Sequence, residues 1–285
     1  MKAALPKGPV AMKLKARAVE KPWGRCALPA GFGRSRRERP VGEIWFEAAN
    51  KRALPLLVKY IFTAEKLSVQ VHPDDAQARA RGGGNGKSEC WYIVDAEPGA
   101  VIGLGFKEAV DRETLRRAAL DGSIEALMDW KPARAGDFFH VPPGTVHAIG
   151  AGVSLIEVQQ HSDITYRLYD YGRPRELHLD DALAVASPLP YPEEQAARVQ
   201  RGRCRTLVTC PHFQLEYIGH GGPVERMRER QRWVLPLRGT AAIDGMTAAP
   251  GECMLVAPGA SLDVSEGGAI LMAAAADAAM LRAAA

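Results

Sequence analysis

Short apolar-alternating segments separated by Gly, Pro and Asp fill much of this chain, and they constrain its fold more than any other feature. The alternation matches the two-residue period of a β-strand. We expect strands, in chain order, at 44–47, 56–62, 67–72, 89–94, 137–141, 153–159 and 165–170, with further short strands over 203–275. Mostly-β halves of this kind fit sandwiches or jelly rolls, so the chain is predicted to be mostly β.

Residues 111–129 interrupt the strand pattern and look helical. Asp111 can cap a helix that ends at Gly122, because Asp accepts hydrogen bonds from the first backbone N–H groups and Gly favours the end of a helix. Ser123 can cap a second short helix in the same way. The sequence therefore predicts a small helical insert near 109–130.

A proline-rich stretch at 187–192 marks the best candidate for a domain boundary. It follows a segment at 180–186 that we expect to be helical, and strand-like segments resume after it. We therefore expect a larger β domain over 1–190, which contains the helical insert, and a smaller β domain over 191–285.

Length and composition fit a cytoplasmic globular protein. The chain has 285 residues, enough for two ordinary domains or one large one, and a net charge of only +4 with scattered basic residues, which favours a solvated surface over a nucleic-acid partner. The first residues have no long apolar core, and Asp277 and Arg282 interrupt the apolar tail, so we expect neither a secretory signal nor a membrane span. Five cysteines without Cys-x-x-Cys spacing fit reduced thiols.

The strand expected at 67–72 has one apolar face and one polar face. Because strand side chains alternate, Ser68, Gln70 and His72 point one way, and Leu67 and its alternating neighbours point the other way. Three polar groups on one face need water, a ligand or an ion. A Gln carbonyl oxygen and a His nitrogen that point in one direction form half of a metal site.

Two further stretches could complete this half-site. Residues 136–147 fit the pattern Gly-x5-Pro-x-Gly-x2-His of the second cupin motif. In that pattern a turn set by Pro and Gly leads into a return strand that carries His147 into the mouth of a barrel. In the segment 86–91, Lys87 and Glu89 share one strand face and could line the same cavity.

Together Gln70, His72, Glu89 and His147 make a set of two nitrogen and two oxygen ligands, which a divalent ion such as Zn²⁺ accepts. Each residue has a simpler interpretation. A histidine can be a hydrogen-bonded structural residue, and Glu89 can pair with Lys87. Four candidates on expected barrel strands, two of them in a Gln-x-His pair, favour the metal site.

The segment 136–147 has a weak counterpart at 251–261. Both run from Gly and an acidic residue through an apolar strand to a Pro-containing turn. The second copy lacks the terminal His. If the two halves are related, we expect the C-terminal domain to lack the metal ligands.

A last polar stretch, 162–173, contains an arginine that would be costly to bury without an anionic partner. Thr165, Arg167 and Tyr169 share one strand face there. One interpretation is a structural ion pair between Arg167 and a nearby aspartate. The other is a guanidinium that holds a polar anionic substrate beside the metal.

Taken together, these stretches strongly resemble the type I phosphomannose isomerases (mannose-6-phosphate isomerases), in their short bacterial form. Several long motifs in order are more specific than any one of them. The resemblance covers most of the chain and rests on segments 21–24, 41–45, 55–59, 67–75, 86–92, 143–148 and 162–173.

The resemblance implies a cupin, a jelly-roll β-barrel, followed by a second, cupin-like domain. It implies one zinc ion per chain and reversible conversion of mannose 6-phosphate to fructose 6-phosphate through an enediol. The implied metal ligands are Gln70, His72, Glu89 and His147, the implied catalytic residues Arg167, Glu157 and Lys87, and the expected substrate contacts Ser68, Lys87 and Arg173. Glu157 is the expected proton carrier, with metal-bound water and Lys87 as alternatives.

Two other functions remain open at this point. A metal cupin of different chemistry, such as a dioxygenase, would favour more histidines than the two found here. A sugar-binding cupin without activity would not require Glu89, Arg167 and Glu157. We expect a small-molecule sugar phosphate as the partner, no nucleic acid or membrane, and a monomer or weak homodimer.

Overall fold

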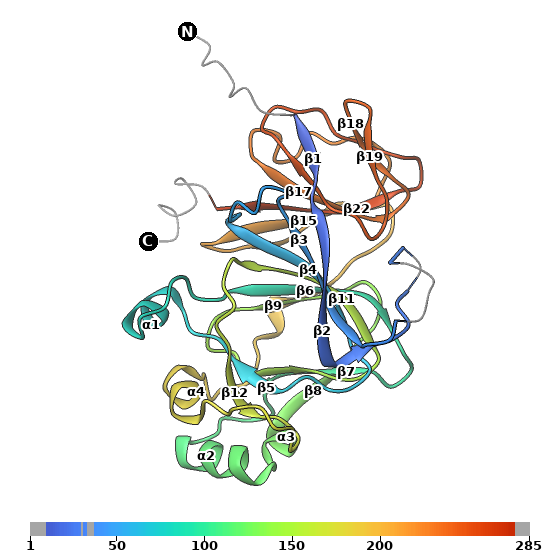
Figure 1. The fold of residues 1–285 in the computed structure, drawn as a ribbon. Coiled ribbons are helices and arrows are strands. Elements are labelled where there is room, and N and C mark those ends of the chain that lie inside the picture. Colours follow the sequence, from blue (N-terminus) through green and yellow to red (C-terminus); the bar gives the residue numbers. More distant parts are fainter. Residues whose placement is uncertain (1–9, 30, 33–36, 277–285) are drawn as a thin grey trace. The chain divides into compact units, whose positions relative to one another are not determined.

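The computed structural model describes residues 10–29, 31–32 and 37–276. Their contacts divide the chain into two compact units (Figure 1). Among the described residues, the larger unit spans Arg17–Val199, and the second contains 10–16 and 200–276. The second unit thus joins residues from both ends of the chain.

Two antiparallel sheets form the larger unit. Their orders are β13-β9-β6-β11-β4-β3-β2 and β12-β5-β10-β7-β8. The strands are β2 (Lys15–Arg25), β3 (Val41–Glu47), β4 (Leu56–Phe62), β5 (Val69–Val71), β6 (Glu89–Ala96), β7 (Val101–Phe106), β8 (Met128–Pro132), β9 (Asp137–Val141), β10 (His147–Ile149), β11 (Val153–Gln160), β12 (Tyr166–Tyr169) and β13 (Ala196–Arg198). The remaining elements are α1 (Asp75–Ala80), α2 (Arg112–Asp121), α3 (Ile124–Leu127), α4 (Leu179–Val185) and the 3₁₀ turn η1 (Glu193–Gln195).

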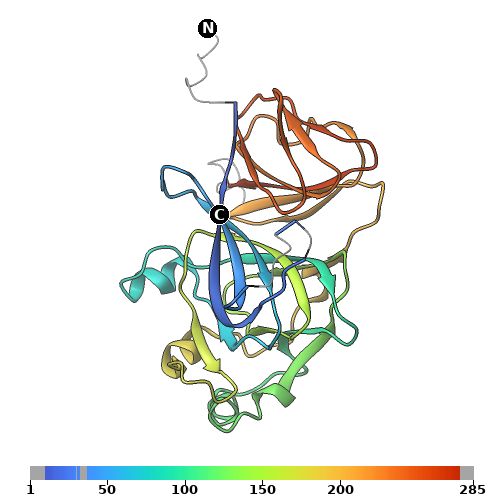
Figure 2. The same ribbon diagram turned by 45° about the vertical axis from the view of Figure 1, so that its right-hand side comes forward.

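The inner faces of the two sheets share one hydrophobic core. Trp91 and Leu155 of the seven-stranded sheet belong to the same buried cluster as Leu104 and Ile149 of the five-stranded sheet. Burial of each such side chain stabilises the fold by about 1.5–3 kcal/mol relative to exposure. The sheets therefore face each other as in a jelly roll (Figure 2).

Helices α2, α3 and α4 cover the outer face of the five-stranded sheet (Figure 1). Val69 and Val71 of β5 pack there with Leu115 of α2, Ile124 of α3 and Leu183 of α4. The apolar side of β5 is thus buried under helices, which leaves its polar side for the interior between the sheets.

The helical insert is present within the expected range. Asp111 accepts a hydrogen bond from Thr114 N at 2.9 Å, and α2 ends at Gly122 with a left-handed φ of 84°. Ser123 precedes α3, but its side chain makes no capping hydrogen bond, so that part of the expectation was wrong.

The second unit is also built from antiparallel strands, in sheets of order β1-β20-β17-β22-β15-β14 and β16-β21-β18-β19. Its strands are β1 (Ala11–Lys13), β14 (Arg205–Thr209), β15 (Phe213–Ile218), β16 (Gly222–Pro223), β17 (Arg232–Arg238), β18 (Ala241–Ile243), β19 (Met246–Ala248), β20 (Met254–Val256), β21 (Asp263–Val264) and β22 (Ala269–Ala275). Side chains from both sheets, including Val234 and Ile243, share one core. The predicted fold class, a mostly β chain with a jelly-roll unit, a small helical insert and a second smaller β unit, is confirmed.

The larger unit continues past the proline-rich stretch at 187–192. Residues 196–198 form β13, which pairs with β9 of the same unit. The ranges expected from the sequence, 1–190 and 191–285, stay a prediction of domain limits. No helix in the described part of the chain is long and apolar enough to span a membrane.

Candidate active site and metal centre

Three side chains from neighbouring strands lie in a row across the five-stranded sheet. In β5, Gln70 is the cross-strand partner of His147 in β10 on one side and of Arg167 in β12 on the other. Cross-strand partners are about 5 Å apart and project from the same face of a sheet. Because Val69 and Val71 turn to the outer face, Gln70 and its two partners turn inward.

Leu67 does not follow the alternation expected for this segment. Strand β5 begins only at Val69, and Leu67 belongs to the inner core cluster rather than to the outer one. It lines the same cavity as Ser68. The two-residue period holds only within a strand, so a residue before its first paired position is not bound by it.

Glu89 enters the site from the opposite sheet, on β6. One of its carboxylate oxygens, Oε2, lies 3.5 Å from His72 Nε2, and the other, Oε1, lies 3.5 Å from His147 Nε2. The ligand atoms of these three buried residues all lie within 4.8 Å of one another. Gln70 completes the group, with its Nε2 atom 3.2 Å from His147 Nε2.

Backbone carbonyls fix the orientation of both imidazoles. The Nδ1 atom of His72 lies 2.8 Å from Ile164 O, and that of His147 lies 2.8 Å from Thr145 O. Because a carbonyl oxygen only accepts hydrogen bonds, Nδ1 carries the proton in each ring, and each Nε2 presents a lone pair to Glu89. Burial lowers the pKa of His147 to about 4 and that of His72 well below its usual value, so both rings are neutral.

The turn before His147 is tied to His72. Gly144 donates its backbone N–H to the carbonyl of His72 at 2.8 Å, and its φ of 86° is in the left-handed region that favours glycine. The turn therefore connects the two histidines through the backbone as well as through Glu89.

These residues fit a divalent metal ion. Burial raises the pKa of the Glu89 carboxyl to about 7, and its Oε1 atom is buried without a hydrogen-bond donor among the described residues. A buried carboxylate oxygen without a partner is costly, and a cation beside it removes that cost. Turning the Gln70 amide by 180° exchanges its nitrogen and oxygen, so that it can offer an oxygen ligand. Two nitrogen and two oxygen atoms suit Zn²⁺.

Lys87 contacts the same group. Its Nζ atom lies 2.5 Å from Glu89 Oε2 and 3.2 Å from His72 Nε2. The simpler interpretation of Glu89, an ion pair with Lys87, is therefore also present in the structure. It occupies only one oxygen of the carboxylate and leaves Oε1 facing His147.

Glu157 lies on β11 within a buried network of charges. Lys59 Nζ is 2.9 Å from Glu157 Oε1, Lys87 Nζ is 3.5 Å from the same oxygen, and Trp91 Nε1 donates to Oε2 at 3.3 Å. Burial alone would raise the pKa of Glu157, but the two ammonium groups outweigh burial and lower it. Glu157 is therefore ionised, and the same two lysines make it a weaker base than a solvent-exposed glutamate.

A small cavity of about 90 Å³ joins these groups. Five of the residues expected at the site line it: Ser68, Gln70, Lys87, Glu157 and Arg167. The other three, His72, Glu89 and His147, are almost fully buried behind Gln70 and Lys87, which contact them. The structure thus brings together eight of the nine residues that the sequence indicates.

Arg173 is the exception. Its Nη2 donates to the carbonyl of Lys66, and its Nη1 is buried 3.5 Å from Asp170 Oδ1. Arg173 does not line the cavity, whereas Arg175 does. The role of Arg173 as a substrate contact stays a prediction.

Four charged residues that line the cavity were not among the expected site residues: Lys21, Glu43, Lys59 and Arg175. Lys59 was detectable, because it is the one charged residue in the apolar run 56–62 and a lysine there must find a buried partner. Arg175 follows β12 in a segment without periodicity, so no spacing rule indicates its direction. The short helix α1 also had a signal, since Asp74 and Gln77 form a capping box.

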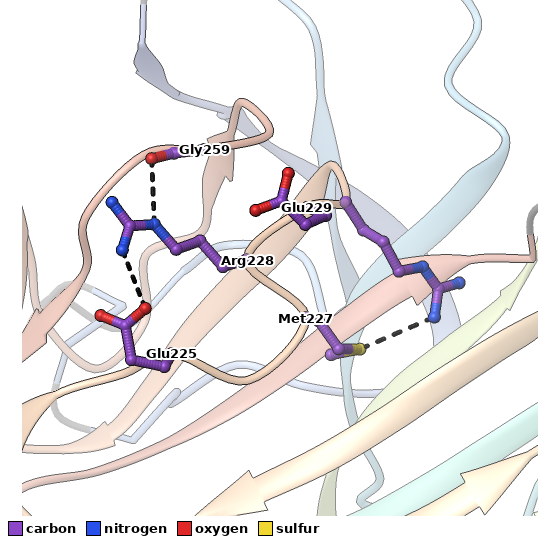
Figure 3. A pocket seen from close by; sticks show the side chains of 6 residues that line it. Glu225, Met227, Arg228, Glu229 and Gly259 are labelled. Atoms are coloured by element: carbon purple, nitrogen blue, oxygen red, sulfur yellow. Dashed lines mark hydrogen bonds and ion pairs between the residues drawn. The ribbon is translucent and has the colours of Figure 1, made fainter.

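Two larger cavities are not lined by the group of possible metal ligands. Figure 3 shows one of about 550 Å³ in the C-terminal unit, where Arg228 pairs with Glu225 at 2.8 Å and donates to the carbonyl of Gly259. The other, of about 480 Å³, is lined mostly by residues 46–57 of the larger unit. Within the described residues, the group of His, Cys, Asp or Glu able to hold a metal is the one beside the small cavity.

Comparisons with known proteins point to one family. The chain is 44% identical over 152 residues to the mannose-6-phosphate isomerase of Streptococcus mutans, a match that covers 50% of this chain and only 48% of that protein. It is 34% identical over 238 residues to mannose-6-phosphate isomerase ManA of Bacillus subtilis, covering 69% of this chain and 75% of that protein. No family model matches the chain.

The fold gives the same result. The crystal structure of the mannose 6-phosphate isomerase from Bacillus subtilis is 26% identical and superimposes with a TM-score of 0.79, covering 93% of this chain and 99% of that one. The chain spans about half the length of the Streptococcus mutans relative but three quarters of the Bacillus subtilis one. The jelly-roll core, the site between its sheets and these similarities together show that the chain belongs to the type I mannose-6-phosphate isomerase family of aldose–ketose isomerases.

Proposed function

We propose that this protein is a zinc-dependent mannose-6-phosphate isomerase that interconverts mannose 6-phosphate and fructose 6-phosphate through an enediol. The observation that carries the proposal is the pair of neutral imidazoles whose Nε2 atoms lie 3.5 Å from the two oxygens of Glu89, beside a cavity lined with basic side chains. The proposed isomerisation follows from membership of the family, and the proposed zinc follows from the two nitrogen and two oxygen ligand atoms at the site.

Gln70, His72, Glu89 and His147 would hold one zinc ion. Such an ion, when bound, polarises substrate oxygens and stabilises the negative charge of an enediolate. The carbonyls of Ile164 and Thr145 orient the imidazoles through Nδ1, as outer hydrogen-bond partners of metal ligands commonly do.

Glu157 is the proposed proton carrier. Its carboxylate is ionised and lines the cavity. It would take the proton from C2 of the aldose and return it to C1, while the proton of the C2 hydroxyl moves to O1, so that C2 becomes the ketone carbonyl and C1 carries a hydroxyl group. Lys87, whose ammonium lies between Glu89 and Glu157, would pass the hydroxyl proton from O2 to O1, and it would serve as the carbon proton carrier only after giving up a proton of its own.

Removal of the metal tests the function directly. Purified protein is expected to isomerise mannose 6-phosphate in a coupled assay, to lose that activity after chelation and to regain it when zinc is added back. Absence of turnover with zinc bound would contradict the proposal that the protein is an isomerase. Turnover that survives complete chelation would remove the metal from the mechanism but leave the isomerase proposal intact.

Arg167 is expected to stabilise negative charge on the substrate, because its half-buried guanidinium lines the cavity one strand away from Gln70. Arg167→Ala should lower kcat about 100- to 1,000-fold, the usual effect of losing one preorganised donor to a developing oxyanion. Zinc content should not change, because Arg167 is not one of the ligands. Turnover and metal content of the same preparation are the measurements, and near-normal kcat in this variant would exclude Arg167 from the chemistry.

A further inference from the structure

We propose that Arg175, held by Asp170, binds the phosphate group of the sugar phosphate, and that it does so in place of Arg173. This inference rests on the proposed function, because it assigns one end of the same cavity. It also defines how the substrate is oriented.

Asp170 fixes the guanidinium of Arg175. The Nε and Nη2 atoms of Arg175 each lie 2.6 Å from one oxygen of Asp170, a carboxylate only 2% exposed. This bidentate arrangement uses two of the five N–H donors of arginine and sets the plane of the group. Three donors remain for a ligand in the cavity that Arg175 lines.

The location of Arg175 follows from the order of the strands. Asp170 comes directly after β12, the edge strand that carries Arg167. His147 lies two strands away from that edge, with Gln70 between. A side chain anchored on Asp170 is therefore at the side of the sheet away from His147.

This side of the cavity has an excess of positive charge. Arg173 and Arg175 both face the single carboxylate of Asp170. Burial lowers the pKa of Arg167, and the positive charge of nearby Arg175 lowers it further. Three guanidinium groups and the buried Asp170 carboxylate carry a net charge of about +2, which exposed Glu176 lowers to about +1. A phosphate group carries about −1.5 to −2 at pH 7 and is attracted by that excess.

The lysines of the cavity do not offer the same excess. Lys59 pairs with Glu157 and Glu43, and Lys87 pairs with Glu89 and Glu157. Lys21, the third lysine that lines the cavity, pairs with Glu43 at 3.4 Å. Positive charge near the metal ligands is therefore balanced by carboxylates. A sugar phosphate would be bound with its phosphate at Arg175 and its carbonyl carbon toward Glu157 and the metal ligands.

Arg173 is less suited to this role. Its Nη2 donates to the carbonyl of Lys66, its Nη1 is buried, and its side chain does not line the cavity. Its charge adds to the local potential, but Arg175 has the donors that a phosphate can reach.

The test compares the zinc-loaded wild-type protein with R175Q, R173Q and R116Q. Arg116 is the matched control, because it pairs with Asp180 on the surface at 2.6 Å and does not line the cavity. Binding of inorganic phosphate is measured by calorimetry and by competitive inhibition, and kinetics are measured with mannose 6-phosphate. Thermal melting reports whether loss of the Asp170 pair unfolds the protein, and R175K, which keeps the charge, replaces R175Q if it does.

We expect R175Q to weaken phosphate binding and to raise KM about 10- to 100-fold, as for the loss of one charge-assisted contact, with kcat changed less than about threefold. R116Q should match the wild type, and R175K should restore part of the affinity. Wild-type phosphate affinity in R175Q, a larger loss in R173Q than in R175Q, or no phosphate binding by the wild type would each overturn the assignment. Phosphate binding that depends on Arg175 in a protein without isomerase turnover would instead contradict the proposed function alone.

Discussion

His147→Ala is expected to release zinc and to lower isomerase turnover at least about 1,000-fold, because metal stabilisation of developing charge is worth several kcal/mol and each 1.36 kcal/mol is tenfold in rate. The alanine removes one of the two imidazole Nε2 atoms that lie beside Glu89 and would bind the metal. It also leaves the carbonyl of Thr145 without its imidazole donor. Metal analysis of the purified variant and the coupled assay measure the two losses.

His220→Ala is the matched control, because His220 is exposed in the C-terminal unit and contacts only the adjacent carbonyl of Gly221 in the described structure. It should keep zinc and activity. Full zinc content in His147→Ala would contradict the ligand assignment. Zinc loss with unchanged turnover would contradict the role of the metal.

Glu157→Gln is expected to lower turnover about 100- to 10,000-fold, the range for loss of a general base. Glutamine has the same shape but cannot accept the proton. The decisive measurement is exchange of the C2 proton of mannose 6-phosphate in D₂O, followed by NMR, because exchange depends on the proton carrier even where net conversion is slow. Both exchange and turnover should fall together, with zinc retained.

Glu43→Gln separates this role from a structural one. Glu43 is the other buried carboxylate beside Lys59, at 3.7 Å, so its loss disturbs the charge balance at Lys59 without removing the proposed base. We expect less than about a tenfold loss of turnover, since this change removes no proton-transfer group. An equal loss in both variants would show that pairing with Lys59, rather than proton transfer, explains the effect of Glu157→Gln. Normal exchange in Glu157→Gln would exclude Glu157 as the proton carrier and leave Lys87 or metal-bound water in that role.

Strand periodicity indicates which side chains share a face, because a slip of one residue would reverse every side chain on a strand. Gln70, His72 and Glu89 all face the interior as their alternation indicated. His147 was predicted by the turn motif that contains Gly144, where the left-handed backbone sends the chain into β10. The roles assigned to these residues stay predictions until the variants are measured.

The sequence was less informative where no period applies. Arg173 and Arg175 are two residues apart in a connecting segment, and only the contacts with Lys66 and Asp170 determine which of them reaches the cavity. Leu67 lies just before strand β5, and its side chain packs in the inner core rather than on the outer face with Val69 and Val71. Both depend on tertiary contacts that a single sequence does not encode as a pattern.

The hydrogen bond between Gly144 N and His72 O has a consequence for how the metal exchanges. The two imidazoles are held by backbone segments that are bonded to each other, so the ordering entropy of the ligands is lost when the barrel folds rather than when the ion binds. Apo protein should therefore keep a preorganised site, unlike a zinc finger, which requires its metal in order to fold. Loss of zinc would abolish isomerase activity while the protein stays folded and able to bind zinc again.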